Sequence, residues 1–279
     1  MSFKLKLENS RILKGIVETL SSIIDETEFK VTENEFSITA MDPSRVCLLK
    51  LTIDKEDFDE YEFEEGGSGK GGEDEVAQHK IGLNLDDLDK ILKRSSTDDS
   101  IEINFKENDN KIKIVMQREG MSRSRTFSLA LLDIEIEEIP MDTLLNYDYP
   151  TRWVIDPEFL VEAIKDAEIY SEILNIKAVK DQALVFNSSG QIGEMEYNLA
   201  LEDLIESEID ANSTGAYSLA FLKAILKIAS ITEKLTVFLE TDHPLKMIFN
   251  LLEGGKLSYF LAPRVEEAEF EDEDDMDVY

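Results

Sequence analysis

The chain has 279 residues, of which 42% are hydrophobic, enough to bury a substantial core in one large domain or two ordinary ones. Its single cysteine, Cys47, excludes an intramolecular disulfide, and the lack of a leader or long apolar run predicts a soluble, intracellular protein. The net charge of -32 argues against contact with DNA, unless the 29 basic residues gather on one face.

The first half of the chain is predicted to combine two helices with short antiparallel strands. Apolar residues at helical spacing indicate helices over 12–24 and 85–92. Asn9 or Ser10 can cap the first helix, and Asn84 can cap the second. Short β-branched and apolar segments separated by turn residues predict strands around 29–31, 36–38, 47–53, 100–105, 111–117 and 125–131.

The same order of elements recurs in the second half, where we expect helices over 157–167 and 218–226. The second helices of the two halves align at an offset of 134 residues, with Leu85 on Leu219, whereas the first helices align at 147. A polar, glycine-rich stretch at about 64–78 accounts for the 13 extra residues and is expected to be a flexible insertion. The chain is therefore interpreted as an internal duplication.

This duplication predicts an α+β fold with two similar domains, each with two helices packed on an antiparallel sheet. We expect an N-terminal domain over 1–132 and a C-terminal domain over 151–266. Residues 133–150, which begin by alternating apolar and acidic side chains, are expected to form an extended connector between them. The tail at 267–279 is strongly acidic and is expected to be disordered.

Basic side chains gather on the faces of the four predicted helices that the apolar stripes leave exposed. They are Arg11, Lys14, Lys90, Lys93, Arg94, Lys165, Lys223 and Lys227. If the helices lie on one side of the sheets, these cations would form a positive surface that contacts phosphates without reading bases. The alternative is that lysines such as Lys90 only complement the helix macrodipole, and acidic Glu18 and Glu162 interrupt the pattern.

Candidates for catalysis or metal binding are few. His79, His243 and Cys47 form neither a metal cluster nor a pair of nucleophile and base. The stretch 66–71 lacks the glycine spacing and the hydroxyl residue of a phosphate-binding loop. We therefore expect no catalytic residues, no metal and no cofactor. The alternatives are an acidic interaction protein of the histone-chaperone kind, acting through its tail, and an enzyme of unassigned chemistry.

Five blocks of sequence resemble the proliferating cell nuclear antigen family, and its archaeal members more than its eukaryotic ones. The blocks are 29–33, 38–46, 90–94, 125–127 with 132–133, and 261–267. They span nearly the whole chain in the family's order. The resemblance implies a non-enzymatic DNA sliding clamp, in which three two-domain subunits form a ring with helices inside and sheet outside. Such a ring encircles duplex DNA without sequence preference and keeps DNA polymerase processive.

The resemblance also implies where the subunits meet. The strand near 123–129 of one subunit would pair with the strand near 190–197 of the next, which removes both exposed edges. Charged residues would face one another across this boundary, Arg94 and Arg125 on one side and Glu158 and Glu162 on the other. A heterotrimeric or checkpoint-type clamp stays possible, because one sequence does not say whether its two edges match each other.

The family's partner site is an apolar groove beneath the connector. By resemblance, it would be formed by Met41, Val46, Leu48, Ile136, Ile139, Pro244, Phe260, Ala262 and Pro263. Partners with a short motif of a glutamine, an aliphatic anchor and two aromatics would bind there. The resemblance implies the clamp loader, DNA polymerase, flap endonuclease and DNA ligase as partners, and no membrane. We expect a cytoplasmic, nucleoid-associated protein, or a nuclear one if the source is eukaryotic.

Overall fold

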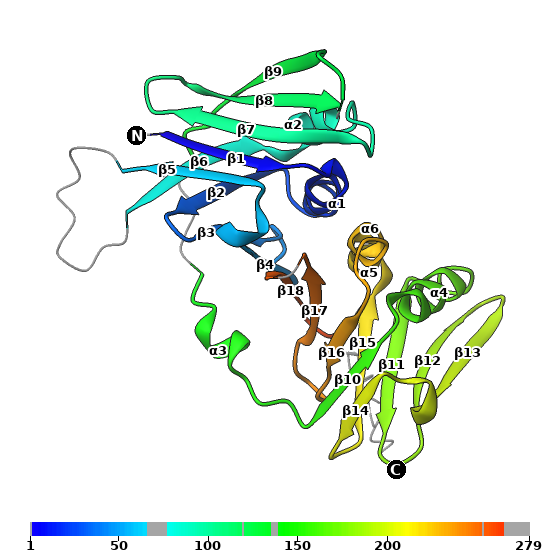
Figure 1. Cartoon of the computed structure of the whole chain (residues 1–279). Coiled ribbons are helices and arrows are strands. Elements are labelled where there is room, and N and C mark those ends of the chain that lie inside the picture. The colour runs from blue at the N-terminus through cyan, green and yellow to red at the C-terminus, as the bar shows by residue number, and fades with distance from the viewer. Residues whose placement is uncertain (1, 66–76, 119, 135–138, 253, 265–279) are drawn as a thin grey trace, which may run out of the picture.

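The computed structural model describes residues 2–65, 77–118, 120–134, 139–252 and 254–264, and Figure 1 traces the chain through them. Most of the glycine-rich insertion, residue Ile136 of the expected groove and the acidic tail lie outside the described residues. Two halves of similar architecture lie next to each other, and the connector with the one-turn helix α3 (Asp142–Leu145) passes from one to the other (Figure 1).

Within the described residues, the first half holds nine strands and two helices. They are β1 (Ser2–Leu7), α1 (Ser10–Ser21), β2 (Glu26–Thr32), β3 (Glu35–Met41), β4 (Cys47–Asp54), β5 (Glu60–Glu64), β6 (Gln78–Asn84), α2 (Leu85–Leu92), β7 (Asp99–Lys106), β8 (Lys111–Arg118) and β9 (Ser124–Ala130). A short 3-10 turn at Lys55–Asp57 follows β4.

The second half repeats this order. Its elements are β10 (Thr151–Ile155), α4 (Pro157–Ala167), β11 (Ile173–Val179), β12 (Ala183–Gly190), β13 (Gly193–Ala200), β14 (Glu206–Ile209), β15 (Ser213–Ser218), α5 (Leu219–Ala224), α6 (Leu226–Ala229), β16 (Leu235–Phe238), β17 (Leu245–Leu251) and β18 (Gly255–Leu261). A 3-10 turn at Leu201–Asp203 follows β13, as its counterpart follows β4. The predicted duplication and the α+β class are confirmed.

Three of the helices begin at a side chain that accepts a hydrogen bond from their first turn, which satisfies a backbone N–H that the helix itself leaves free. The Asn9 side chain accepts from the Arg11 N–H over 2.9 Å, and the Asn84 side chain accepts from the Asp87 N–H over 2.9 Å. Asp156 does the same for α4. The predicted cap at Asn84 is confirmed, and Asn9 rather than its neighbour caps the first helix.

The helix predicted over 218–226 is instead two short helices, α5 and α6, which meet at Ile225. The Ile225 N–H donates to the Leu222 carbonyl over 3.3 Å, a three-residue spacing that tightens the chain before the Ala229 N–H returns to the Ile225 carbonyl over 2.9 Å. Leu222, Ile225 and Ile228 are all fully buried. One apolar stripe therefore runs through both helices, and packing on the core keeps them in line.

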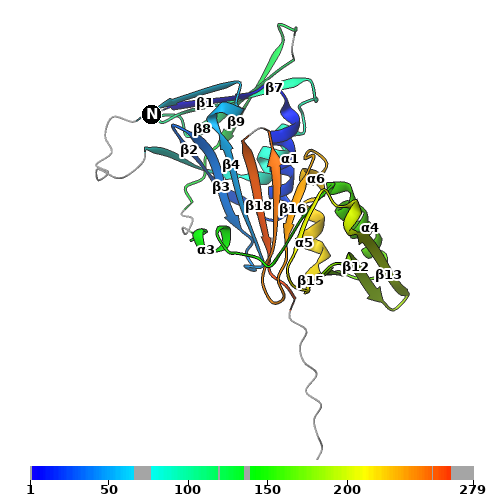
Figure 2. The same ribbon diagram turned by 60° about the horizontal axis from the view of Figure 1, so that its bottom comes forward.

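The described strands form three antiparallel sheets, and the strand order of these sheets explains how the halves join. A five-stranded sheet has the order β5-β1-β7-β8-β9, and a four-stranded sheet has the order β13-β12-β11-β15. The nine-stranded sheet combines the counterparts of both, in the order β14-β10-β16-β17-β18-β4-β3-β2-β6. The halves are therefore joined where β18 pairs with β4, as Figure 2 shows with these strands side by side.

The helices adjoin one another along one side of the molecule. Helix α1 contacts α2 on one flank and α6 on the other, and α6 contacts α4. Figure 2 shows α1 and α5 behind the strands β18 and β16, and α4 next to β12 and β13, which it contacts. Each helix buries an apolar stripe in one continuous core, to which α1 contributes Leu13, Ile16, Val17 and Leu20. The opposite helix faces are left to solvent, which is the arrangement that a helical inner wall requires.

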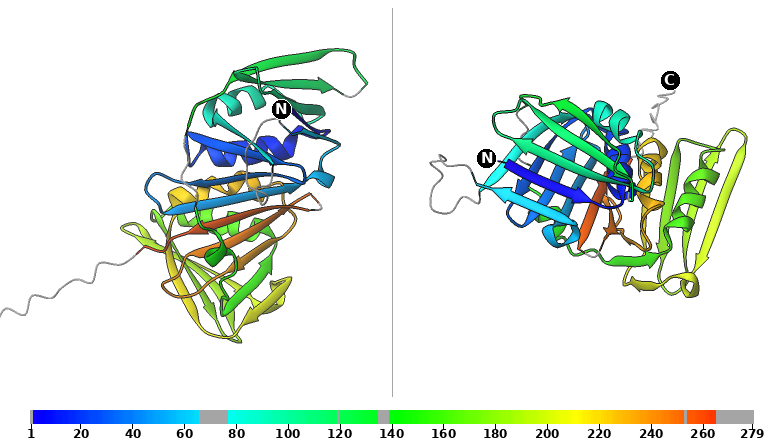
Figure 3. Two further views of the ribbon diagram at one scale, coloured as in Figure 1. Left: turned by 90° about the vertical axis from the view of Figure 1, so that its left-hand side faces the viewer. Right: turned by 45° about the horizontal axis from the view of Figure 1, so that its top comes forward.

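Strands β9 and β13 are edge strands at opposite ends of the molecule (Figure 3). Among the described residues, β9 pairs only with β8, and β13 pairs only with β12. An unpaired edge exposes a row of backbone N–H and C=O groups that favours pairing with another strand. As for membranes, none of the described helices has the length and apolar character needed to cross a bilayer.

Candidate nucleic-acid interface and partner groove

The predicted cations are on the exposed faces of the helices. Arg11 and Lys14 are on α1, Lys90 is on α2 with Lys93 and Arg94 directly after it, Lys165 is on α4, Lys223 is on α5 and Lys227 is on α6. Seven of the eight are exposed, and Lys14 is half-buried. Because the helices adjoin one another, these cations share one side of the molecule.

Carboxylates on the same helical surface pair with several of these cations. Within α2 and its last turn, Lys90 lies 2.9 Å from Asp87, and Lys93 lies 2.6 Å from Asp89. The hydrogen bond from Lys93 to Asp89 is the largest cause that raises the lysine pKa, so Lys93 keeps its charge. Exposed ion pairs of this kind contribute little to stability, so phosphates can compete for the lysines.

Two further pairs join neighbouring helices. Lys227 on α6 lies 3.4 Å from Glu18 on α1, and Lys223 on α5 pairs with Glu168, which directly follows α4. The helical surface is therefore a mixture of both signs rather than a uniformly positive wall. Any binding of phosphates to it is expected to be weak and salt-sensitive.

Arg11 and Lys14 have a structural role that the sequence pattern did not indicate. The Arg11 guanidinium donates to the Ser230 carbonyl over 2.9 Å, and the Lys14 ammonium lies 3.5 Å from the Ser95 carbonyl. Ser230 caps the C-terminus of α6, and Ser95 lies just beyond α2. Both cations therefore neutralise the negative ends of neighbouring helices, so the macrodipole explanation applies to them between helices rather than within one.

At the β9 edge, Arg125 is anchored by a buried carboxylate. Its Nη2 lies 2.6 Å from Asp99, which is 2% exposed, and its Nη1 donates to the Arg94 carbonyl over 2.9 Å. Burial acts to raise the pKa of Asp99, but hydrogen bonds from Ser96 and the charges of Arg125 and Arg118 outweigh it and hold the pKa below its ordinary value. Arg125 is therefore fixed in place at the edge strand.

At the β13 edge, the expected partners of Arg125 are exposed. Glu158 and Glu162 lie on α4, and Glu162 accepts a hydrogen bond from the Tyr197 hydroxyl over 3.4 Å. In a single chain these groups are at the other end of the molecule from Arg125. The pairing across a subunit boundary therefore stays a prediction.

Four of the predicted groove residues come together on the outer face of the nine-stranded sheet. Leu48 and Phe260 are opposite each other on β4 and β18, and Met41 and Ile139 pack against them. Val46 packs against the main core instead, while Pro244, Ala262 and Pro263 are half-buried. Ile136 lies outside the described residues.

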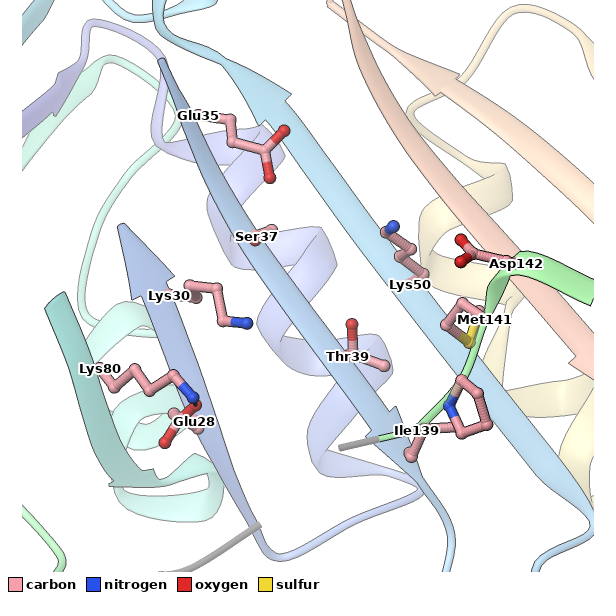
Figure 4. Close-up of a pocket in the computed structure, with 11 residues that line it drawn as sticks. Glu28, Lys30, Glu35, Ser37, Thr39, Lys50, Lys80, Ile139, Met141 and Asp142 are labelled. Carbon is pink, nitrogen blue, oxygen red and sulfur yellow. Dashed lines mark ion pairs between the residues drawn. The ribbon is translucent and has the colours of Figure 1, made fainter. Parts of the chain in front are cut away.

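The sequence reading missed three residues that complete this apolar cluster. Met141 is 6% exposed and packs with Leu48 and Phe260, and Leu144 and Leu145 of α3 cover them. Figure 4 shows Met141 with Ile139 and Asp142 on the connector, beside Lys50 of β4 and Thr39 of β3, where a cavity of about 320 Å³ opens. A signal was present, because residues 141, 144 and 145 follow the spacing of one helical turn.

A buried lysine beneath the connector was also missed. Lys246 on β17 is 5% exposed, and its ammonium lies 5.0 to 5.9 Å from the ring centroids of Tyr149, Phe238 and Phe260. It donates to the Leu145 carbonyl over 2.7 Å. Burial lowers the pKa of Lys246, and the aromatic faces and the carbonyl offset part of the cost of burying its charge.

The connector after α3 is fastened to the hairpin between β16 and β17. The Tyr147 hydroxyl donates to Glu240 over 2.7 Å and lies 2.9 Å from Nε2 of His243, whose ring stacks on the tyrosine. The Tyr149 hydroxyl donates to the Pro244 carbonyl over 2.8 Å. His243 therefore has a structural partner, as does His79, which is surrounded by aromatic rings.

Within the described ranges, no group of three or more His, Cys, Asp or Glu side chains is arranged to hold a metal ion. Burial raises the pKa of the Cys47 thiol to about 12, so this cysteine is a poor nucleophile at neutral pH. Neither finding adds a catalytic candidate to the surfaces described above.

Comparisons with known proteins agree over the length of the chain. The family model for the N-terminal domain of proliferating cell nuclear antigen matches residues 2–139, and the model for the C-terminal domain matches residues 156–264. A DNA polymerase sliding clamp from Thermococcus gammatolerans is 34% identical over 269 residues, covering 96% of this chain and 100% of the relative. One from Pyrococcus horikoshii is 33% identical with the same coverage.

Solved structures share the fold. Proliferating cell nuclear antigen from Thermococcus kodakaraensis superposes with a TM-score of 0.80 at 24% identity, covering 94% of this chain and 100% of that one. The protein from Entamoeba histolytica gives a TM-score of 0.80 at 24% identity and covers 94% and 99%. The domain models and the full-length relatives together show that the chain belongs to the proliferating cell nuclear antigen family.

Proposed function

We propose that the chain is a subunit of a DNA sliding clamp, three copies of which close a ring around duplex DNA and keep a DNA polymerase processive. The observation that carries the proposal is the pairing of β18 with β4 inside the chain. It joins two similar halves edge to edge, and the counterparts of these two strands, β9 and β13, are left as edges.

The internal junction is a template for a junction between copies. Strand β9 ends the first half as β18 ends the second, and β13 has the place in the second half that β4 has in the first. Repeating the β18–β4 pairing between β9 of one copy and β13 of the next would form a second nine-stranded sheet, of the same strand order, across each subunit boundary. A head-to-tail contact of this kind forms a closed ring when its rotation closes, and β9 and β13 are then paired in every subunit.

The duplication also predicts the register of this pairing. Inside the chain, Tyr259 is opposite Leu49 and Leu257 is opposite Leu51. The strand pairings of the two halves make Phe127 the counterpart of Tyr259, and Met195 the counterpart of Leu49.

Transferring the internal register to the subunit boundary places Phe127 opposite Met195 and Arg125 opposite Tyr197 of the next copy. Phe127, Met195 and Tyr197 are half-buried in the single chain, so strand pairing would complete the burial of apolar surface that the edges expose.

The charges of the two edges are complementary. Arg123 and Arg125 mark the β9 edge, whereas Glu194 and Glu196 are exposed on β13. With Arg125 opposite Tyr197, the arginine comes close to Glu162 of the next copy, because the Tyr197 hydroxyl contacts that carboxylate. Complementary edges within one sequence favour three identical subunits over a heterotrimer.

In such a ring the helices would face the DNA, and topology rather than tight binding would retain it. The eight helix cations, partly paired with carboxylates, are suited to weak phosphate contacts that allow sliding. The clamp would be non-enzymatic, and it would act at DNA in the cytoplasm. Clamp loader, polymerase, flap endonuclease and ligase would dock through short peptides at the groove of Met41, Leu48, Ile139 and Phe260.

A retention assay on linear duplex DNA tests the encircling. The purified chain threads onto duplex with one blocked end, the second end is then blocked with a bulky protein, and bound clamp is separated by gel filtration at moderate salt. We expect retention on the doubly blocked DNA and loss after a nuclease cuts it between the blocks. Equal retention before and after cutting would mean simple electrostatic binding and would overturn the proposal.

A further inference from the structure

The partner groove of the free chain is already filled by the chain's own connector. Met141 inserts its side chain against Leu48 and Phe260, and all three are at least 94% buried. Leu144 and Leu145 cover the same cluster from α3. A peptide side chain therefore cannot reach Phe260 or Leu48 unless the connector yields.

We propose that Met141 is a resident anchor, which occupies the position that the aliphatic side chain of a partner peptide takes, so that partners bind by exchange with α3. This inference rests on the proposed function, since it assigns the regulation of the groove described there. The partner that fits is an extended peptide with one aliphatic anchor and an oxygen acceptor next to it.

The structure of helix α3, which covers the groove, favours its displacement. Helix α3 has four residues, and no side chain caps its N-terminus. A helix of one turn has almost no stability of its own and is held by its packing alone. Methionine is unbranched and flexible, so it can leave and re-enter an apolar site without precise fit. The packing of Met141, Leu144 and Leu145 is therefore the barrier that a partner must overcome.

The displacement has a defined limit along the chain. Tyr147 is held by Glu240 and His243, and Tyr149 is held by the Pro244 carbonyl. Movement of α3 would thus end before residue 147, and the connector beyond it would stay attached to the hairpin. The exchange exposes the anchor site without freeing the whole connector.

Lys246 explains why the partner peptide needs an oxygen acceptor next to its aliphatic anchor. Its ammonium donates to the Leu145 carbonyl at the end of α3, and it lies across from Phe260 in the β17–β18 ladder. When α3 leaves, this buried cation loses that oxygen, and an ammonium without an acceptor is costly away from water. A peptide that brings a main-chain carbonyl or a carboxylate beside its anchor restores the contact.

The direction in which Met141→Ala changes peptide affinity distinguishes exchange from a groove in which Met141 stays in place when the peptide binds. If Met141 were a permanent wall of the groove, Met141→Ala would remove contacts from the bound peptide and weaken binding. If Met141 competes with the peptide, the same change vacates the site and strengthens binding. The matched control is Met41→Ala on β3, because Met41 lines the groove in both cases and its truncation should weaken binding.

The probe is a fluorescent twelve-residue peptide with a glutamine, a leucine anchor and two phenylalanines, titrated by anisotropy with the full chain. We expect Met141→Ala to bind it about ten-fold more tightly than the wild type, which corresponds to about 1.4 kcal/mol, and Met41→Ala to bind more weakly. Weaker or unchanged binding by Met141→Ala overturns the exchange while leaving the groove in place. If neither the wild type nor Met141→Ala binds the peptide, the proposed partner groove is wrong, and the exchange is overturned with it.

A measurement on the wild-type chain avoids any effect of the variant on folding. The methyl group of Met141, labelled with ¹³C and assigned with Met141→Leu, belongs to a side chain that is buried with Leu48 and Phe260 in the free chain. Exchange predicts that its resonance moves to the position of a solvent-exposed methionine when the peptide binds. A Met141 methyl that stays shielded in the complex would contradict the proposal.

Discussion

His79 illustrates how far the environment of one residue departs from its sequence context. It is 4% exposed, its ring lies 4.8 to 5.8 Å from the rings of Phe3, Phe63 and Phe105, and Nε2 lies 3.1 Å from the Glu64 carbonyl. Burial is the largest cause that lowers the pKa of His79 below 6.5. The side chain is therefore a neutral core residue and takes no part in a site.

This burial predicts a pH dependence of stability. Because the pKa is lower in the folded chain, the unfolded chain binds the proton more readily between the two values. The stabilising contribution of neutral His79 is present above pH 6.5 and is lost as the pH falls toward the folded pKa. Urea unfolding at pH 7.5 and 5.0 should show a smaller acid-induced loss in His79→Phe than in the wild type. The same loss in both would show that another group is responsible.

Individual residues also show what could and could not be predicted from the sequence. Caps such as Asn84 could be predicted because an N-cap is a local interaction, written within three or four residues. The burial of Lys246 could not, because it depends on Tyr149, Phe238 and Phe260, which only the folded sheet and connector bring together. For the same reason the family resemblance pointed to Met41, Leu48, Ile139 and Phe260, but not to the Met141 that packs among them.

At the scale of elements, the helical surface predicts a specific salt response. Lys93 and Lys227 are exposed on the helix side, whereas Lys30 and Lys50 are on the outer face of the sheet. Each phosphate contact contributes a slope of about -0.9 to the dependence of log affinity on log salt. Replacing Lys93 and Lys227 by alanine should reduce the magnitude of this negative slope by about two, measured by anisotropy with short duplex DNA. Replacing Lys30 and Lys50 should leave the slope unchanged, and equal effects of the two pairs would place the DNA outside the helical surface.

The sequence pattern predicted some helices and strand pairings better than others. The apolar stripes of α1, α2 and α4 are periodic over eight or more residues, so these helices and their buried faces could be predicted, but α1 ends at Ser21 and not at the predicted residue 24. The break at Ile225 and the one-turn helix α3 could not, because a few residues of helical spacing do not outweigh tertiary packing. The pairing of β18 with β4 joins segments some 200 residues apart, and no local period encodes such a register.

At the scale of the whole molecule, the register transferred from the internal junction can be trapped chemically. The double variant Phe127→Cys with Met195→Cys should form disulfides between copies under mild oxidation, seen as covalent dimers and trimers on a denaturing gel. Native Cys47 is 1% exposed, so it should not interfere. The matched control is Phe127→Cys with Tyr197→Cys, which is two residues out of register. Stronger cross-linking in the control would show that the predicted register is wrong.

Three identical chains can close a ring only if the two edges of this one sequence complement each other. Sedimentation equilibrium of the purified full-length chain tests it without DNA or partners. We expect a species of three times the chain mass of 31.7 kDa. A single chain that stays monomeric at micromolar concentration, or that stops at a dimer, would contradict it.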